Sequence, residues 1–160
     1  ITIVLAPPSP LIGLLGANNR SMVAFAAQDV SATTGGAYTG EVVAPTFALV
    51  GASYAIVGHS ERRARGDTND IVAEKLSHAL AHGLTPILCV GESERDGEGR
   101  YLSFIREELA SALEPLLCRQ KARQILTPIW TRKARCFLRP RLWPAKFFLC
   151  RWGLLAIRPW

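Results

Sequence analysis

The chain has 160 residues, of which 49% are hydrophobic and 20% are charged. This length and composition suit a globular domain with one hydrophobic core and exclude a disordered or fibrous chain. The net charge of +6 is unevenly distributed, because residues 1–115 hold all 13 acidic side chains and eight basic ones, whereas residues 116–160 hold 11 basic side chains and no acidic ones. We therefore expect one domain over residues 1–116 and a basic tail over residues 117–160, rich in Trp, Arg and Pro and poorly ordered.

We do not expect residues 1–19 to form a membrane-spanning helix. Residues 1–19 carry no charge, but Pro7, Pro8 and Pro10 interrupt them too early for a membrane-spanning helix. They also lack the basic start of a secretory signal. Cys89 is the single cysteine of the acidic part, which indicates a reducing compartment without disulfides. We expect a cytoplasmic protein that does not contact membranes.

Strand and helix patterns alternate along the acidic part. Short apolar runs predict buried strands at residues 1–6, 22–27, 54–58 and 85–90. Helical patterns are predicted at residues 11–15, at 44–50, from a cap at Asp67 or Thr68 to Gly83, and from about Gly99 to Leu116. Such alternation is typical of parallel βαβ units. Because no glycine-rich dinucleotide fingerprint follows the first strand, the pattern favours an α/β barrel over a doubly wound sheet.

The last two predicted helices each carry an apolar stripe. The first stripe consists of Val72, Leu76, Ala79 and Leu80, and the second of Leu102, Ile105, Leu109, Leu113 and Leu116. His78 and His82 lie four residues apart and could share a metal ion, but no third ligand is near them in sequence. We interpret both as helix-face residues at or near solvent. Cys89 ends a buried strand and is read as a small apolar filler.

A glycine-rich loop over residues 31–41 contains Gly35, Gly36 and Gly40. It lacks the Lys-Ser/Thr pair of a phosphate-binding P-loop and has no dinucleotide spacing. We expect its glycines to provide the backbone torsions that project the tip of the loop.

His59 follows directly on the strand at residues 54–58, with Ser60 and Glu61 behind it. Loops after strands carry function in α/β proteins, and histidine has an unperturbed pKa near neutrality. The pattern indicates acid–base or hydrogen-bonding chemistry at His59. The alternative is a histidine that ends a strand and caps a turn without further role.

Five motifs occur together in the acidic part. They are Ala-Pro-Pro at 6–8, Ala-Gln-Asp-Val at 27–30, Gly-Ala-Tyr-Thr-Gly-Glu at 36–41, Val-Gly-His-Ser-Glu-Arg-Arg at 57–63 and Cys-Val-Gly-Glu at 89–92. In this order and spacing, residues 1–116 resemble the triosephosphate isomerase family. The resemblance implies a partial (β/α)8 TIM barrel, covering the second to fifth βα units, that works without metal or organic cofactor.

The resemblance assigns roles to individual residues. It implies that His59 is the neutral electrophile that polarises the substrate carbonyl while dihydroxyacetone phosphate and glyceraldehyde 3-phosphate interconvert through an enediolate, in glycolysis and gluconeogenesis. Glu61 matches a carboxylate that organises this site, and Ser60 stands next to it. Asp29 replaces the family's usual Asn and adds a charge that the sequence does not place.

The family is also homodimeric, which implies an interface on two stretches of this chain. The implied interface residues are Gln28, Tyr38, Thr39, Gly40 and Glu41. Among them, Thr39 matches a threonine that reaches into the partner's active site.

Three parts of the family pattern are not found in this sequence. One is the closing lid with the glycine amides that hold the phosphate, which residues 131–136 do not resemble. The first strand, with a substrate-binding Asn and Lys, would precede Ile1. The general base is a Glu in a Tyr-Glu-Pro motif, and Thr127 stands in its slot within residues 126–130. A hydroxyl cannot take a carbon-bound proton at neutral pH. We expect this chain to be inactive alone, and poorly soluble because half a barrel leaves two open sheet edges and an uncovered interior face.

The basic tail admits three readings. Arginines with interleaved Trp could contact nucleic acid, which would make the chain a half-barrel binding module. Residues 147–157 could form an amphipathic membrane contact, although Arg151 lies in their middle. The third reading is a shift of reading frame near Leu116, where composition changes and the motifs stop. We favour the third and expect no nucleic-acid partner.

Overall fold

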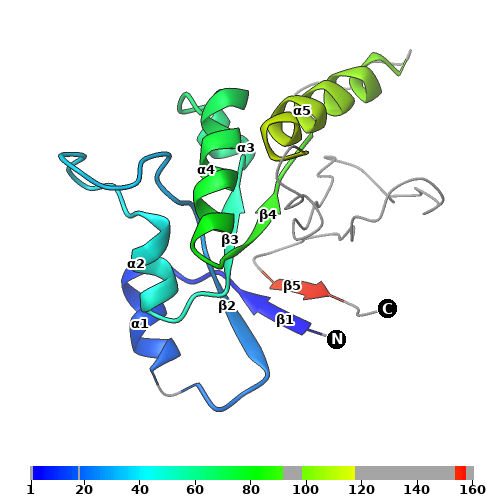
Figure 1. The fold of residues 1–160 in the computed structure, drawn as a ribbon. Coiled ribbons are helices and arrows are strands. Elements are labelled where there is room, and N and C mark those ends of the chain that lie inside the picture. Colours follow the sequence, from blue (N-terminus) through cyan, green and yellow to red (C-terminus); the bar gives the residue numbers. More distant parts are fainter. Residues whose placement is uncertain (1, 18, 92–98, 118–153, 158–160) are drawn as a thin grey trace.

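The computed structural model describes residues 2–17, 19–91, 99–117 and 154–157 (Figure 1). Strands and helices alternate as the sequence predicts. In chain order the elements are β1 (Thr2–Leu5), α1 (Ser9–Gly16), β2 (Val23–Ala27), α2 (Ala44–Leu49), β3 (Tyr54–Val57), α3 (Ser60–Arg63), α4 (Asn69–Ala81), β4 (Thr85–Leu88), α5 (Arg100–Leu117) and β5 (Leu154–Ile157).

The sheet has the strand order β4-β3-β2-β1-β5. Strands β1 to β4 lie side by side in chain order, and each neighbouring pair among them is parallel. A doubly wound sheet would reverse this order at a switch point, whereas a barrel keeps strands consecutive. The prediction of a partial TIM barrel is therefore confirmed.

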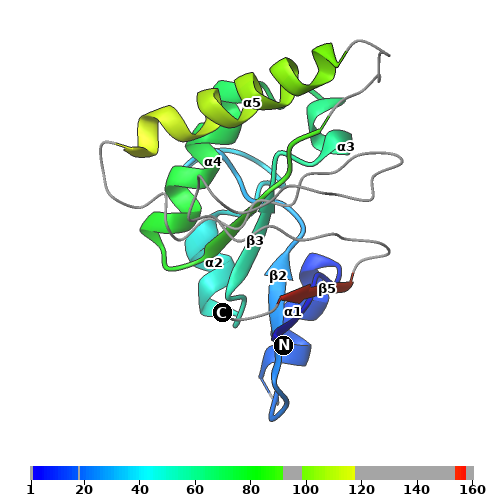
Figure 2. The ribbon, with the colours of Figure 1, turned by 90° about the vertical axis from the view of Figure 1, so that its right-hand side faces the viewer.

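The two faces of the sheet carry separate apolar clusters, because successive side chains of a strand point to opposite sides. Phe25, Ala55 and Leu88 belong to the larger cluster, which includes buried residues of α1, α2, α4 and α5. Helices α1, α2 and α4 cover this face (Figure 1), and α5 packs against α4 (Figure 2). On the opposite face, Val4, Ala26 and Ile87 form the smaller cluster. One helix-covered face is the arrangement of a barrel wall.

Strand β5 was not foreseen from the sequence, which predicted an irregular tail. It pairs antiparallel with β1, joining Thr2 to Ile157 and Leu5 to Leu154. The edge of β1 is thereby covered, so within the described residues the outer strands of the sheet are β4 and β5. The other predictions for residues 117–160 lie outside the described residues. No helix in the described ranges is long and apolar enough to span a bilayer.

The helix stripes are confirmed with one exception. All four predicted stripe residues of α4 are buried, and Thr68 is its cap, since its hydroxyl accepts a hydrogen bond from the Ile71 amide at 3.3 Å. On α5, Ile105, Leu113 and Leu116 are buried, but Leu102 is 56% exposed and its prediction was wrong. Tyr101 packs against the core at that end of the helix instead.

The glycine-rich loop has the predicted backbone. Gly35, Gly36 and Gly40 have φ angles of 132°, 111° and 87°. Residues 34–41 are all exposed, so the tip of this loop projects from the domain.

Candidate active site

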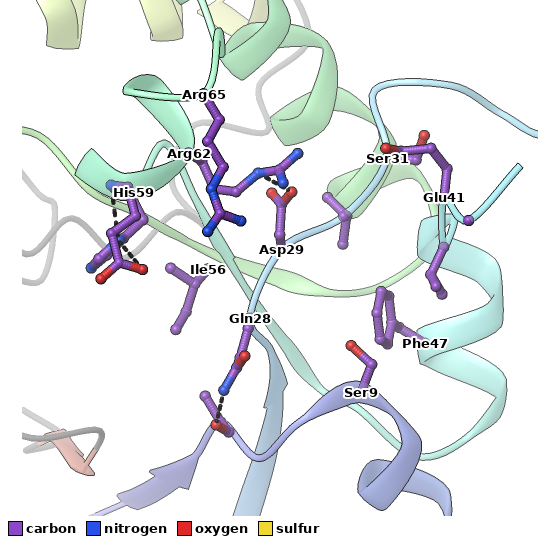
Figure 3. Close-up of a pocket in the computed structure, with 15 residues that line it drawn as sticks. Ser9, Gln28, Asp29, Ser31, Glu41, Phe47, Ile56, His59, Arg62 and Arg65 are labelled. Atoms are coloured by element: carbon purple, nitrogen blue, oxygen red, sulfur yellow. Dashed lines mark hydrogen bonds and ion pairs between the residues drawn. The ribbon is translucent and has the colours of Figure 1, made fainter. Parts of the chain in front are cut away.

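A cleft of about 480 Å³ lies at the carboxyl ends of β1, β2 and β3 (Figure 3). Each strand delivers residues to it directly: Ala6 follows β1, Gln28 follows β2, and His59 comes one glycine after β3. Its polar lining consists of Ser9, Gln28, Asp29, Ser31, Glu41, His59, Glu61, Arg62 and Arg65. Because the strands are parallel, their ends meet at one rim, where α/β barrels hold their sites.

The turn that carries His59 depends on Gly58. Gly58 has a φ of +74°, a backbone torsion that residues other than glycine rarely adopt. A Cβ at this position would lie 3.1 Å from the Cys89 carbonyl oxygen and 3.3 Å from Val72 Cγ1. The Cys89 amide also donates to the Val57 carbonyl at 2.8 Å, so β4 approaches β3 closely here. Glycine permits both this approach and the sharp exit of the chain toward the cleft.

His59 is the N-cap of α3, and the short helix orients its ring. The Glu61 amide donates to His59 Nδ1 at 3.4 Å, and the Glu61 carboxylate lies 4.0 Å from the same nitrogen. A nitrogen that accepts a hydrogen bond carries no proton, so in the neutral ring the proton is on Nε2. The His59 side chain is 38% exposed and lines the cleft. It can therefore donate a hydrogen bond to a ligand there.

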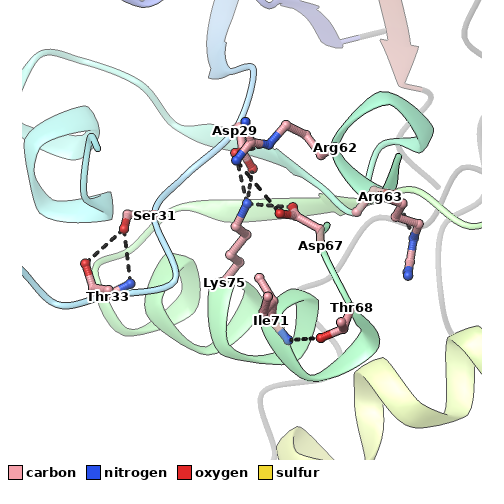
Figure 4. A network of polar contacts seen from close by, with 10 residues as sticks. Asp29, Ser31, Thr33, Arg62, Arg63, Asp67, Thr68, Ile71 and Lys75 are labelled. Carbon is pink, nitrogen blue, oxygen red and sulfur yellow. Dashed lines mark hydrogen bonds and ion pairs between the residues drawn. The ribbon is translucent and has the colours of Figure 1, made fainter. Parts of the chain in front are cut away.

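Asp29, which the sequence left without a partner, belongs to a buried ionic network (Figure 4). Lys75 Nζ on α4 donates to both Asp29 carboxylate oxygens, at 3.0 and 2.9 Å, and to Asp67 at 2.6 Å. Arg62 Nε lies 2.7 Å from Asp29 Oδ2, as an ion pair without hydrogen-bond alignment. Two carboxylates thus face two cations, which compensates the charge of Lys75, a residue only 2% exposed.

Within this network, desolvation has the largest effect on the pKa of Asp29. Burial raises the pKa of Asp29 above its ordinary value, and this outweighs the hydrogen bond and charge of Lys75 and the charge of Arg62, which lower it. Arg65, by contrast, is exposed at the rim of the cleft.

Lys75 and Asp67 were missed as partners in the sequence. The signal was present, because Lys75 lies inside the apolar stripe of α4, between Val72 and Leu76. A charge at a core-facing helix position requires an opposite charge. The sequence shows the requirement but not which carboxylate meets it.

The structure brings together most of the residues assigned by resemblance. Gln28, Gly40, Glu41, His59 and Glu61 all line the cleft. Gln28 also donates to the Ala6 carbonyl at 2.9 Å. Tyr38, Thr39 and Ser60 are exposed and do not line it. Thr127 lies outside the described residues.

The remaining candidates from the sequence are His78, His82 and Cys89, and none of them lines the cleft. His78 is half-buried and His82 exposed, and within the described ranges they belong to no group of three His, Cys, Asp or Glu residues that could hold a metal ion. Cys89 is half-buried beside the Gly58 turn.

The consecutive parallel strands and the cleft at their carboxyl ends define an α/β-barrel protein. Comparison with known sequences then gives the particular family: residues 1–131 match the family described as triosephosphate isomerase. The chain belongs to the triosephosphate isomerase family. The match continues beyond residue 116, where the recognisable motifs stop, and includes the stretch that contains Thr127.

Several curated bacterial proteins named triosephosphate isomerase are similar to the chain. The protein from Xanthomonas oryzae pv. oryzae (strain PXO99A) is 40% identical over 145 residues, covering 88% of this chain and 58% of the relative. The protein from Ralstonia nicotianae (strain ATCC BAA-1114 / GMI1000) is 46% identical over 114 residues, covering 69% and 46%. The protein from Pseudoalteromonas translucida (strain TAC 125) is 45% identical over 118 residues, covering 72% and 46%. The chain thus spans about half the length of the curated relatives it matches.

Proposed function

We propose that this chain supplies the carbonyl-polarising part of a triosephosphate isomerase site, which interconverts dihydroxyacetone phosphate and glyceraldehyde 3-phosphate through an enediolate in glycolysis and gluconeogenesis. Family membership supports the proposal, and one observation carries it. His59 stands at the end of β3 with Nδ1 turned to the Glu61 amide and its side chain in the cleft.

A neutral imidazole in this tautomer has two uses in the reaction. Its Nε2–H donates to the substrate carbonyl oxygen, which stabilises the charge that develops there when a proton leaves the neighbouring carbon. The imidazole then passes its Nε2 proton to one enediolate oxygen, and Nε2 recovers a proton from the other. The use of a neutral histidine is the established chemistry of the family and is carried over to His59.

Two neighbours of His59 have supporting roles in the proposal. The Glu61 amide holds Nδ1, and the exposed Glu61 carboxylate lies close enough to influence the ring. Ser60 begins α3, where its backbone carbonyl accepts a hydrogen bond from the Ala64 amide at 2.9 Å. The proton transfers need an acid and a base only, so the proposal includes no metal ion and no organic cofactor.

The proposed site needs a general base that takes the carbon-bound proton. Thr127 occupies the slot in which the resemblance expects this carboxylate. We therefore propose that the chain binds a triose phosphate but does not turn it over alone. In a coupled isomerase assay, we expect a rate equal to that of buffer.

The partners follow from the same proposal. The exposed loop tip, with Tyr38 and Thr39, is offered as a contact with a second copy of the chain, and its neighbours Gly40 and Glu41 reach back to the cleft. Tyr38 is 56% exposed, so its side chain is accessible to a partner. A glycolytic role would place the protein in the cytoplasm.

Binding is tested by nuclear magnetic resonance of the three histidines, with dihydroxyacetone phosphate as the added ligand. We expect selective shifts of the His59 ring signals, with His78 on α4 and His82 at the C-cap of α4 as references. Equal behaviour of all three histidines, or no shift at any of them, would refute the proposed site.

A further inference from the structure

Arg63 holds both peptide groups that flank His59. Its side-chain Nε donates to the Gly58 carbonyl at 3.1 Å, and its backbone amide donates to the His59 carbonyl at 3.0 Å. These carbonyls belong to the peptide groups before and after the His59 Cα. Their orientation sets the backbone torsions of His59 and therefore the direction in which its side chain leaves the chain.

Arg63 is itself held by two helices. Its Nη1 donates to Asn69 Oδ1 at 2.7 Å, at the start of α4, and its Nε lies 3.4 Å from Glu108 Oε1 on α5. Figure 4 shows that Arg62 points into the Asp29–Lys75 network whereas Arg63 points away from it. The two adjacent arginines thus serve different partners.

Glu108 also contacts the segment that follows β4, the strand beside β3. Its Oε2 accepts a hydrogen bond from the Gly91 amide at 3.1 Å, just after β4. The Glu108 and Arg63 side chains are only 6% and 18% exposed, so each charge needs the other for compensation. Glu108 therefore ties the exits of β3 and β4 to one helix.

The arginine side chain also closes the space around the turn. A Cβ at Gly58 would lie 3.4 Å from Arg63 Nη2. This nitrogen is buried and has no hydrogen-bond partner among the described residues, so the guanidinium is held by its other contacts. The Arg63 guanidinium meets Gly58 and Asn69 from two different nitrogens, Nε and Nη1, held in one plane, with Glu108 beside Nε. The ammonium of a lysine is a single donor centre and cannot reproduce this spacing.

We propose that Arg63 and Glu108 are a pair of positioning residues that fix the Gly58–His59 turn and thereby the direction in which the His59 imidazole faces the cleft. The inference rests on the proposed function of His59 and extends it to two side chains on α3 and α5. Neither residue lines the cleft. They act through the backbone on either side of His59.

The test uses the full chain with selectively ¹⁵N-labelled histidine and no ligand. Long-range ¹H–¹⁵N spectra report the proton distribution between Nδ1 and Nε2 of each of the three histidines. The first variant is Arg63→Lys, which replaces the planar guanidinium with an ammonium. The second is Glu108→Gln, which loses the charge but keeps an acceptor for the Gly91 amide. Their controls are Arg106→Lys and Glu107→Gln, at exposed positions of α5, the helix that carries Glu108.

In the wild type we expect different ¹⁵N chemical shifts for Nδ1 and Nε2 of His59. In both variants we expect these two ¹⁵N shifts to move toward a common average. The signals of His78 and His82, the helical circular dichroism and both controls should match the wild type. If His59 keeps its wild-type spectrum in both variants, the proposal is wrong. A joint change of all three histidines would also overturn it, because the pair would then merely stabilise the fold.

A variant that fails to fold does not end the test. If Arg63→Lys loses its helical signal, Glu108→Gln decides, since it preserves side-chain volume. Failure of the proposed function is separable, because it appears as the absence of a His59 response to dihydroxyacetone phosphate, whereas the positioning role is measured without ligand.

Discussion

Lys75 offers a sharp test of the buried network. Its ammonium lies within 3.0 Å of both Asp29 and Asp67, and its side chain is 2% exposed within the apolar stripe of α4. Lys75→Met keeps an unbranched side chain of similar length on the helix but removes the cation. The two carboxylates would then face each other, with Arg62 as the remaining cation.

The magnitude follows from which group loses its partner. Removing one member of a buried ionic set costs about 3–5 kcal/mol, because an uncompensated charge stays in the interior. Asp67 bears most of this loss, since its side chain is 8% exposed and its distance to Arg62 is 3.8 Å. Adding Asp67→Asn to Lys75→Met should therefore recover about 1–3 kcal/mol.

Pulse proteolysis across a urea series measures these free energies of unfolding at sub-micromolar protein, a concentration at which the expected low solubility does not interfere. The control is Glu74→Met, which makes a polar-to-apolar change at the adjacent exposed position of α4. We expect the control to stay within about 0.5 kcal/mol of the wild type.

Two results would refute the reasoning. If Lys75→Met costs less than about 1 kcal/mol, the carboxylates do not depend on the ammonium. If the double variant is no more stable than Lys75→Met, Asp67 is not the group left without compensation.

Three further predictions concern the site and its support. Gly58→Ala should lose about 2–5 kcal/mol of stability, because of the positive φ and the contact of the new Cβ with the Cys89 carbonyl. The control Gly83→Ala, with a φ of 78° and no atom within 4 Å of the new Cβ, should lose only about 1–2 kcal/mol. Equal losses of the two variants in pulse proteolysis would contradict the steric argument. Burial raises the pKa of Asp29, so its carboxyl contributes stability below pH 3.8 that is lost as the pH rises through the folded-state pKa. In urea unfolding followed by circular dichroism, Asp29→Asn should therefore gain stability relative to the wild type as the pH rises over this range. A difference between the two proteins that does not change with pH would contradict this. Thr68→Ala should cost about 1 kcal/mol through the lost cap of α4, measured in the same way, and an unchanged midpoint would show that the cap is dispensable.

The order of strands and helices could be predicted from the sequence because the signals are local. Alternation of apolar runs with helical stripes depends on neighbours a few residues apart, and turn residues such as Gly58 and Gly83 mark the ends. The position of His59 at a strand end followed in the same way. Its chemical role came from resemblance to a family, since a histidine at a strand end is compatible with several roles.

The partners of charged residues were decided only by the tertiary structure. Asp29 and Lys75 are 46 residues apart, and nothing local in the sequence tells which of 13 acidic side chains meets a lysine in an apolar stripe. The same holds for Arg63 and Glu108, which come from different helices. Long-range pairing depends on how elements pack, not on local pattern.

Packing also decided two features that the local pattern does not show. Leu102 has the spacing of a core residue, but Tyr101 occupies the core at that end of α5. The pairing of β5 with β1 joins the two ends of the described chain. The sequence by itself determined the class of fold and the rim at which the site lies, because both follow from local periodicity. Only the tertiary structure showed which charges compensate one another and which side chains contact the Gly58–His59 turn, because these depend on distances between residues far apart in the chain.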